Sequence, residues 1–454
     1  MTDIPSAIDA YLQSNLNDYI QTTMRLCAQP SVSATGEGVG ACAQLLAGEL
    51  RQHHFQVQLC PTAGQPVILA HAQGASDRTM LFYNHYDVQP PEPLELWTTP
   101  PYAPTLRDGN LYARGAADDK GEIVARLAAL DAVRAARHGE LPCSITFVIE
   151  GEEETSSPHL GQVLREHQAE LAAQAGIWEA GGLDSEGQAV VTLGLRGVLG
   201  VELSVKVMDR DAHSGQGHLL PNAAWRLVWA LNGLKGPDQR IRIPGFYDHA
   251  KPPTPRERDL LLALPPRDEL YRRNLGVKTF VREGAGAELN VAVFEPAATI
   301  NGLTAGYQGP GEKTVIPARA SAKLDFRLVP DQDPADILAK LRAHLDAQGF
   351  ADVEIEERGS TPPAKTSAED PFVTMVARTA AEVYGRPSLL DPIAGGSGPM
   401  HMFFEALGPV PIVFTGIQYW NNRAHSPDEH FRLQDFASGA RYIARIVENF
   451  ASMV

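Results

Sequence analysis

Hydrophobic positions in the first part of the chain follow two patterns. Stretches in which apolar residues recur every three or four positions predict helices, and short uninterrupted apolar runs predict buried strands. The predicted helices span residues 8–27, 36–55 (with Thr35 as its cap) and 123–136. The predicted strands span residues 55–59, 67–70, 79–83 and 145–149. Strands that alternate with helices are typical of an α/β layered domain.

The pattern changes near Arg196-Gly197. From there, residues 198–208 and 314–329 alternate between apolar and polar positions, as half-exposed strands do. The remaining predicted elements of this part are helices at 222–234 and 334–348, the latter capped by Asp333, and a strand at 353–357. This set predicts a small α+β domain with antiparallel strands. The stretch 236–278 is rich in Pro and Arg and shows only weak periodicity.

After residue 361 the character of the first domain returns, with a helix at 371–384, a buried strand at 411–415 and a last helix at 433–450. A chain of 454 residues exceeds what one hydrophobic core usually supports. We therefore expect two domains: residues 1–197 together with 361–454, and an inserted α+β domain of residues 198–360.

The charge and the cysteines narrow the classes of partner and compartment. A formal net charge of −16 argues against nucleic acid or an anionic membrane as a partner. No apolar run approaches membrane-spanning length, and the first residues do not resemble an export signal, so we expect a cytoplasmic protein. The four cysteines have no CxxC spacing and are expected to be buried free thiols: Cys27, Cys42, Cys60 and Cys143.

Candidate metal ligands follow the predicted strands. His85 comes after strand 79–83, and Glu153 and Glu154 come after strand 145–149. The carboxyl ends of neighbouring parallel strands meet in one crevice, where several carboxylates repel one another unless cations compensate. Carboxylate and imidazole together suit zinc, or manganese or cobalt in its place. Glu179, Asp118 and His425 are the further members of this predicted metal site.

Each of these signals has a plainer interpretation when taken alone. His85 could be a satisfied polar residue at a strand end, and residues 150–154 could be a solvated acidic turn. Asp118 and Asp119 could cap the helix that follows them. The combination favours a metal site, and we expect Asp119 to cap that helix while Asp118 binds metal.

Four motifs in a fixed order make a family resemblance specific. They are His85-Tyr86-Asp87, Gly115-Ala116-Ala117-Asp118-Asp119-Lys120-Gly121, Glu150-Gly151-Glu152-Glu153-Glu154 and Ala424-His425-Ser426. The series resembles the di-zinc metallo-exopeptidase family that includes carnosine dipeptidase, glutamate carboxypeptidase, aminoacylase and succinyl-diaminopimelate desuccinylase. The resemblance implies a mixed-sheet zinc-exopeptidase catalytic domain with an inserted, ferredoxin-like lid domain through which two copies form a homodimer.

The resemblance also implies the ligands of two divalent metal ions, most simply Zn²⁺, with Mn²⁺ or Co²⁺ as alternatives. It implies that Asp118 bridges the two ions, that His85 and Glu179 complete one, and that Glu154 and His425 complete the other.

Two further residues complete the implied catalytic machinery. Asp87 orients His85, and Glu153 is the general base that takes a proton from a metal-bridging water and passes it to the leaving amine. Because Glu153 and Glu154 are adjacent, the residues alone leave open which of the two binds metal.

The inserted domain contributes its own implied site. His213, in Asp211-Ala212-His213-Ser214-Gly215, resembles a lid histidine that reaches the oxyanion in the partner's site. Arg327 and Thr314 lie in motifs that resemble a clamp for the substrate carboxylate, a group for which Arg is suited. The further implied substrate contacts are Gly396 and Ser397, in a glycine-rich loop, and Asn301.

These implications lead to an expected function: metal-dependent hydrolysis of the amide bond of dipeptides or small peptides that carry a free carboxylate. Glu179 departs from the dipeptidase pattern, because relatives that act on a free amino terminus usually carry Asp there. The alternative is therefore an N-acyl-amino-acid deacylase or carboxypeptidase with the same metal site. A non-catalytic scaffold would be expected to have lost a ligand or the general base, and none is missing.

Overall fold

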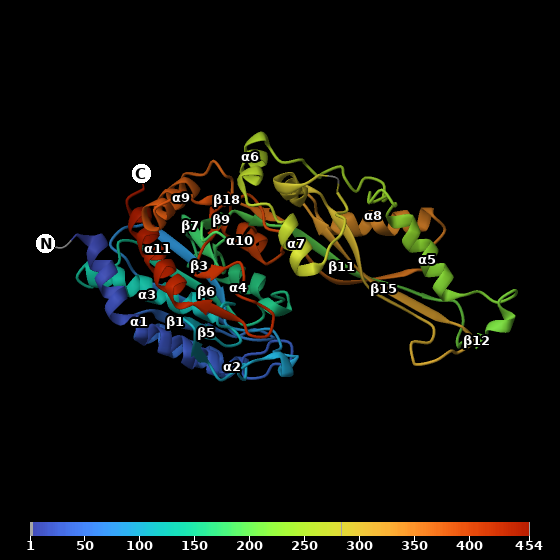
Figure 1. Cartoon of the computed structure of the whole chain (residues 1–454), viewed down its shortest axis with the longest axis horizontal. Helices are drawn as coiled ribbons and strands as arrows, with labels where there is room; N and C mark the ends of the chain where they lie inside the picture. Colours follow the sequence, from blue (N-terminus) through green and yellow to red (C-terminus); the bar gives the residue numbers. More distant parts are fainter. Residues whose placement is uncertain (1–2, 283, 454) are drawn as a thin grey trace. The chain divides into compact units, whose positions relative to one another are not determined.

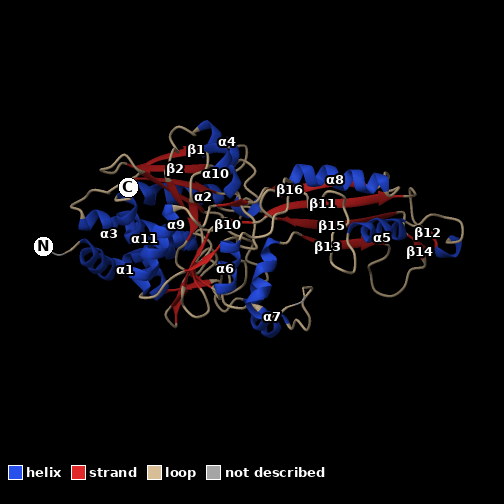
Figure 2. Cartoon of the chain, turned by 90° about the horizontal axis from the view of Figure 1, so that it is seen from above, coloured by secondary structure: helices blue, strands red, loops and turns tan. Residues whose placement is uncertain are grey.

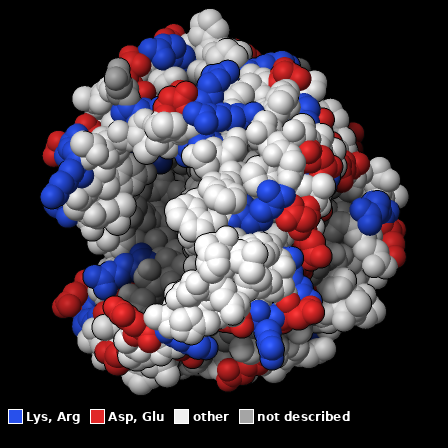
Figure 3. Space-filling model, turned by 90° about the vertical axis from the view of Figure 1, so that its right-hand side faces the viewer, with Lys and Arg blue, Asp and Glu red and all other residues white. Residues whose placement is uncertain are grey.

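The computed structural model describes residues 3–282 and 284–453, and these residues form two compact units. One unit comprises residues 3–194, 365–392 and 402–453, and the other comprises residues 195–364 and 393–401. The division expected from the sequence assigned residues 393–401 to the first unit. Basic and acidic side chains are interspersed over the face seen in Figure 3.

The first unit is built on a ten-stranded mixed sheet (Figures 1 and 2). The strands along its main path are β1 (Gln56–Cys60), β2 (Val67–Ala72), β6 (Ser144–Glu150), β3 (Thr79–His85), β7 (Ala175–Trp178), β19 (Ile412–Phe414), β9 (Ala189–Thr192), β8 (Gly182–Leu183) and β20 (Gln418–Tyr419), and β18 (Leu389–Asp391) pairs with β9. The central strands β6, β3, β7 and β19 run parallel to one another. A separate three-stranded sheet joins β4 (Thr105–Arg107), β5 (Asn110–Tyr112) and β21 (His430–Arg432).

The long helices of this unit bury apolar faces in the same core as the sheet. They are α1 (Ile4–Ala28), α2 (Val39–Gln52), α3 (Lys120–Ala136), α9 (Pro371–Tyr384) and α11 (Leu433–Ala451). Two shorter helices are α4 (Leu160–Glu166) and α10 (Met400–Leu407). α3 packs against both α1 and α11. The bounds of α9 have local causes: Asp370 accepts the N–H of Phe372, Pro371 suits the first turn, and Gly385 ends the helix with φ +72°.

The second unit contains a four-stranded antiparallel sheet in the order β13-β15-β11-β16. Its strands are β13 (Ala297–Ala305), β15 (Arg319–Leu328), β11 (Gly197–Lys206) and β16 (Glu354–Thr361). Two helices, α5 (Ala223–Leu234) and α8 (Pro334–Ala347), share its core. The chain order β11-α5-β13-β15-α8-β16 is that of a ferredoxin-like fold, as the family resemblance implied, although the periodicity did not predict β13.

Several predicted elements differ from the structure. α2 begins at Val39 rather than near residue 36, because Gly38 adopts φ +71° and Thr35 does not cap the helix. The predicted strand 314–329 is two strands, β14 (Val315–Ile316) and β15, separated at Pro317, which lacks a backbone N–H. The stretch with weak periodicity contains two short helices, α6 (Pro255–Ala263) and α7 (Asp268–Leu275).

Candidate metal centre and active site

Three neighbouring parallel strands position the first candidate residues. β3 ends at His85, β7 is followed at once by Glu179, and β6 leads into the turn that carries Glu153 and Glu154. Because β6, β3 and β7 are adjacent and parallel, their carboxyl ends lie at one edge of the sheet. The predicted convergence of these side chains is therefore a direct result of the strand order.

Asp118 lies between two imidazoles. Its Oδ1 is 2.9 Å from Nε2 of His85, and its Oδ2 is 2.9 Å from Nε2 of His425. The same nitrogen of His425 is 3.2 Å from Oε1 of Glu154, and Nε2 of His85 is 3.7 Å from Oε2 of Glu179. The five predicted ligands thus form one connected cluster with Asp118 at its centre.

The cluster has the donor atoms and the charge of a cation site. Asp118, Glu154 and His425 offer ligand atoms within 4.8 Å of one another, and so do His85, Asp119 and Glu179. Buried oxygens of Glu179 and Asp119 have no hydrogen-bond partner among the described residues. Carboxylates with imidazoles suit zinc or a similar divalent ion. The residues present therefore fit the metal ions that the sequence implies.

The protonation of the cluster supports this interpretation. Burial and the neighbouring charge of Glu153 raise the pKa of Glu179 well above its usual range. Hydrogen bonds to Asp118 and Glu154 raise the pKa of His425 to about 10. Raised pKa values in a cluster of carboxylates indicate strong mutual repulsion, which a bound cation would relieve.

Asp87 connects the metal-ligand strand to the acidic turn. Its carbonyl oxygen lies 3.0 Å from Nδ1 of His85, and its carboxylate oxygen lies 3.4 Å from the same nitrogen. Its two carboxylate oxygens also accept the backbone N–H groups of Glu153 and Glu154. A proton on Nδ1 of His85 leaves Nε2 free as a ligand, so the contact has the geometry of the predicted orienting role.

Glu153 differs from its neighbour Glu154 in its contacts. Glu154 accepts from Gln89 and lies beside His425. The carboxylate of Glu153 has no hydrogen bond or ion pair within the part of the chain that the structure describes. Burial, together with the charges of Glu154 and Asp118, raises the pKa of Glu153 to about 8. A free carboxylate of that pKa is suited to exchanging protons near neutral pH.

The expected helix-capping role of Asp119 is wrong. Asp119 precedes α3, but its side chain makes no cap hydrogen bond. It accepts instead from Nδ2 of Asn84 at 2.6 Å and from the backbone N–H of His85 at 3.2 Å. These contacts direct its carboxylate toward the end of β3, which no local sequence signal indicates.

Two further buried residues support the cluster and were not found by sequence reasoning. Glu429 accepts the N–H groups of Gly115, Ala117 and Asp118 and pairs with Arg114 at 2.7 Å. Arg126 of α3 donates to the carbonyl oxygens of Tyr83 and Trp178, where β3 and β7 end. Both contacts join residues far apart in sequence, and neither residue lies in a motif with a ligand spacing.

The candidate residues of the second unit form two groups. Arg327 donates to Oγ of Ser397 at 3.0 Å and pairs with Asp325 at 2.8 Å, and the carbonyl of the adjacent Gly396 accepts from Arg196. This group has the chemistry of a carboxylate-binding site, since a guanidinium and a hydroxyl both donate hydrogen bonds to carboxylate oxygens.

The other group lies around the small ladder formed by β12 (Ala212–His213) and β14. His213 is exposed, and its Nδ1 accepts the N–H of Gly215. The carbonyl of Thr314 accepts the N–H of Ser214, so Thr314 lies beside His213. Asn301 is exposed at a bulge in β13, and its side chain has no hydrogen bond among the described residues.

The fold and the acidic cluster define a metal-dependent hydrolase of the exopeptidase type. The sequence model of peptidase family M20/M25/M40 matches residues 81–449, and the chain belongs to this family. The family and the fold class expected from the motifs are thereby confirmed. No helix among the described residues has the length and apolar character needed to cross a bilayer.

Within the family, the chain is similar to two dipeptidases and to a solved metallo-carboxypeptidase. Beta-Ala-His dipeptidase of Mus musculus is 29% identical over 389 residues, covering 84% of this chain and 78% of the relative. Cys-Gly metallodipeptidase dug1 of Schizosaccharomyces pombe is 28% identical over 407 residues, covering 86% and 83%. The solved M20 family metallo-carboxypeptidase Sso-CP2 from Sulfolobus solfataricus has a TM-score of 0.91 and 32% identity, covering 96% of this chain and 99% of that one.

Proposed function

We propose that this chain hydrolyses the amide bond of dipeptides that carry a free carboxylate, with the help of two divalent metal ions. The observation that carries the proposal is the position of Asp118, whose two oxygens each lie 2.9 Å from an imidazole nitrogen. Two named dipeptidases among the relatives support the substrate class.

His85, Asp118 and Glu179 would hold one ion, and Asp118, Glu154 and His425 the other. Zn²⁺ fits these ligands best, with Mn²⁺ or Co²⁺ as alternatives. Bound divalent ions supply an acidified water and a polarised carbonyl group. Asp119 lies beside the first set and is a further candidate ligand, since its buried oxygen has no other partner among the described residues.

The chain's own residues would carry the protons and the orientation. Glu153 takes a proton from the attacking water and gives it to the leaving amine, for which its unpaired carboxylate is suited. Asp87 holds Nδ1 of His85 protonated. Arg327, Ser397 and Gly396 bind the substrate carboxylate. Thr314 and His213 lie together in the other group and, with Asn301, would contact the substrate of a partner subunit, where His213 donates to the oxyanion.

Removal and replacement of metal test the proposal directly. Treatment with a chelator should abolish dipeptide hydrolysis, and addition of Zn²⁺, Mn²⁺ or Co²⁺ should restore it. A chain that contains no metal by elemental analysis and still turns over dipeptides would contradict the proposal.

A second function is supported by Glu179 and by the similarity to a metallo-carboxypeptidase. In this alternative the enzyme removes C-terminal residues or N-acyl groups and does not need a free amino terminus. Comparison of a dipeptide with its N-acetylated form decides between the two. Faster cleavage of the acetylated form would favour the carboxypeptidase or deacylase.

We further propose a cytoplasmic homodimer that forms through the second unit. Trp225, Val228 and Trp229 lie on one face of α5 and are 57%, 42% and 56% exposed. An apolar patch of this kind on a helix is typical of a protein interface. The four cysteines are free and buried, which suits a reducing compartment.

The oligomeric state can be measured by light scattering after gel filtration. Trp229→Glu should produce monomers, because it introduces a charge into the apolar face. Ala339→Glu, which adds the same charge to an exposed position on α8, is the control and should leave the dimer intact. A wild-type chain that is monomeric at micromolar concentration would contradict the dimer.

A further inference from the structure

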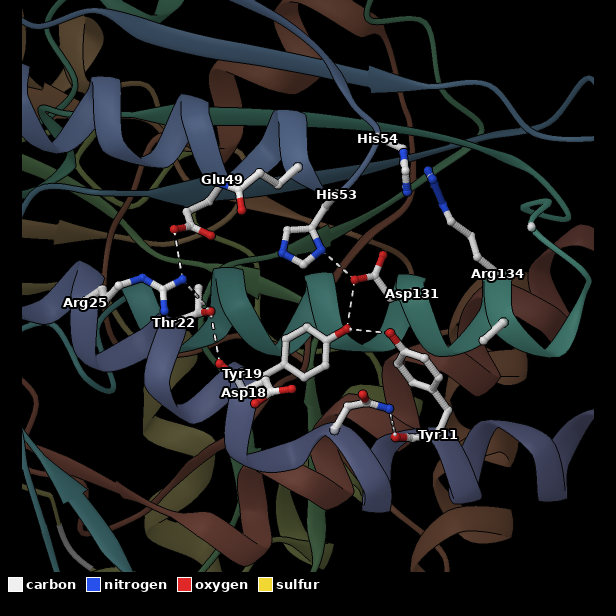
Figure 4. Close-up of a pocket in the computed structure, with 14 residues that line it drawn as sticks. Tyr11, Asp18, Tyr19, Thr22, Arg25, Glu49, His53, His54, Asp131 and Arg134 are labelled. Carbon is white, nitrogen blue, oxygen red and sulfur yellow. Dashed lines mark hydrogen bonds and ion pairs between the residues drawn. The ribbon is translucent and has the colours of Figure 1, made fainter.

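A second polar pocket lies in the first unit, away from the acidic cluster. It has a volume of about 500 Å³ and is lined by α1, by the turn that follows α2, and by the last part of α3 (Figure 4). α3 begins directly after Asp118-Asp119, and Arg134 of the pocket lies 14 residues beyond Lys120, a distance of roughly 21 Å along the helix axis. The pocket is therefore separate from the candidate metal centre.

Two of the three carboxylates that line this pocket, those of Asp131 and Glu49, are satisfied by neighbours, and the third, that of Asp18, is exposed to solvent. Oδ2 of Asp131 accepts from the hydroxyl of Tyr19 at 2.8 Å and lies 2.5 Å from Nδ1 of His53. The Tyr19 hydroxyl in turn lies 3.1 Å from that of Tyr11. At the other end, Glu49 pairs with Arg25 at 3.0 Å. The dashed lines in Figure 4 trace these contacts.

The basic side chains of Arg134 and His54, at the end of the pocket away from Arg25, have no such partners. Nε of Arg134 is buried without a hydrogen bond, and the guanidinium makes no ion pair within the described part of the chain. It packs over the ring of Phe55, 5.6 Å from the centroid. Figure 4 shows the side chain of His54 beside that of Arg134, and the His54 imidazole also lacks a hydrogen bond among the described residues. The fold therefore presents two adjacent donors that no described protein group uses.

A half-buried guanidinium without an anion is costly, because the protein does not replace the water that it loses. Burial lowers the pKa of Arg134, and the charge of Asp131 opposes this shift only from outside ion-pair distance. A guanidinium presents parallel N–H groups that match the two oxygens of a carboxylate or phosphate. A pocket of this volume lies within the range of small-molecule sites.

We propose that this pocket binds a small molecule through an oxyanion, a carboxylate or a phosphate. Arg134 is the principal contact and His54 the second, while the hydroxyl and carboxylate network around Tyr19 forms the opposite wall. The proposal does not depend on the reaction at the metal centre.

Isothermal titration calorimetry of the full, metal-loaded chain tests the proposal. Inorganic phosphate and acetate are titrated separately at constant ionic strength, so that the two sources of an oxyanion are distinguished. Arg134→Gln removes the charge, and Arg134→Lys retains the charge but not the paired N–H groups of the guanidinium. His54→Asn removes the imidazole and keeps a residue that tolerates the left-handed backbone at φ +64°. Arg51→Gln is the matched control, since Arg51 is exposed on α2 and does not line the pocket.

At least one anion should bind saturably to the wild-type chain, and Arg134→Gln should weaken that binding at least tenfold. His54→Asn should weaken it severalfold, Arg134→Lys should retain part of it, and Arg51→Gln should leave it unchanged. Any anion that binds at the metal ions does so in every variant. The difference in anion affinity between the wild type and Arg134→Gln therefore reports binding in the pocket. The proposal is overturned if neither anion binds, or if Arg134→Gln binds as the wild type does.

Discussion

Oε1 of Glu429 accepts the backbone N–H of Asp118 at 3.0 Å, so a buried carboxylate from the last part of the chain holds the residue that lies between the two imidazoles. The same side chain accepts two more N–H groups of this turn and pairs with Arg114. The position of Asp118 therefore depends on a residue that is not itself a candidate ligand.

Glu429→Gln should destabilise the fold and weaken metal binding together. The change leaves the buried Arg114 without its counter-ion, a loss that typically costs about 3–5 kcal/mol. Urea unfolding measures the change in stability, and elemental analysis measures the metal content. Glu382→Gln is the control, because the Glu382 side chain on α9 is 54% exposed. Equal stability of the two variants would contradict the supporting role of Glu429.

Glu153→Gln and Glu154→Gln should separate proton transfer from metal binding. Glu153→Gln should keep its metal and lose roughly 10²- to 10⁴-fold in kcat, the usual contribution of a general base. Glu154→Gln should lose metal affinity, because Glu154 lies beside His425. Metal content and kcat of both variants are the measurements. The reverse result, with metal lost from Glu153→Gln alone, would exchange the two roles.

Arg327→Lys should weaken recognition of the substrate carboxylate. Loss of one charge-assisted hydrogen bond costs about 1.5–3 kcal/mol, or roughly a 10- to 100-fold decrease in kcat/KM. The decrease should be absent for a substrate whose carboxylate is amidated. Arg319→Lys, at an exposed position of the same strand, serves as the control. An equal decrease for both substrates would show that Arg327 acts on something other than the carboxylate.

The buried thiols should resist alkylation in the folded chain. Burial raises the pKa of Cys27 and Cys143 to about 12 and that of Cys60 to about 11. Because the thiolate is the reactive form, a raised pKa lowers the reactive fraction at pH 8, and the rate should rise as the pH is increased. Mass spectrometry after iodoacetamide treatment at pH 8 should find Cys27 and Cys143 alkylated on the order of 10³-fold, and Cys60 on the order of 10²-fold, more slowly than in denatured chain. Rapid labelling of native protein at pH 8 would contradict their burial.

The sequence predicted those parts of the site that follow from strand order and motif order. His85, Glu154 and Glu179 stand at or just beyond the ends of strands whose apolar runs are visible in the sequence, and the structure brings them together. Asp119 was misassigned because an Asp before a helix usually caps it, whereas here tertiary contacts with Asn84 and His85 direct its side chain elsewhere. The roles of Glu429 and Arg126 could not be predicted, since both side chains hydrogen-bond to backbone groups that are distant in sequence and come near only in the folded chain.

In the inserted unit, periodicity predicted three of the four strands of the sheet and its two long helices, but not β13, the interruption of a strand at Pro317 or the helices α6 and α7. These two helices are short, with nine and eight residues, so each shows too few turns for a clear apolar repeat. The missed strand β13 is long, with nine residues, but most of its positions are exposed, so it lacks the apolar alternation that marks the other strands.

His425 and Glu429, which contact Asp118 from two sides, both lie near the end of the chain. During synthesis, a ribosome-bound chain that lacks this final stretch cannot assemble the cluster, however well its earlier strands have folded. The cluster therefore forms only after residues 425–429 have been synthesised, and a product truncated before them would lack two of the contacts that Asp118 makes.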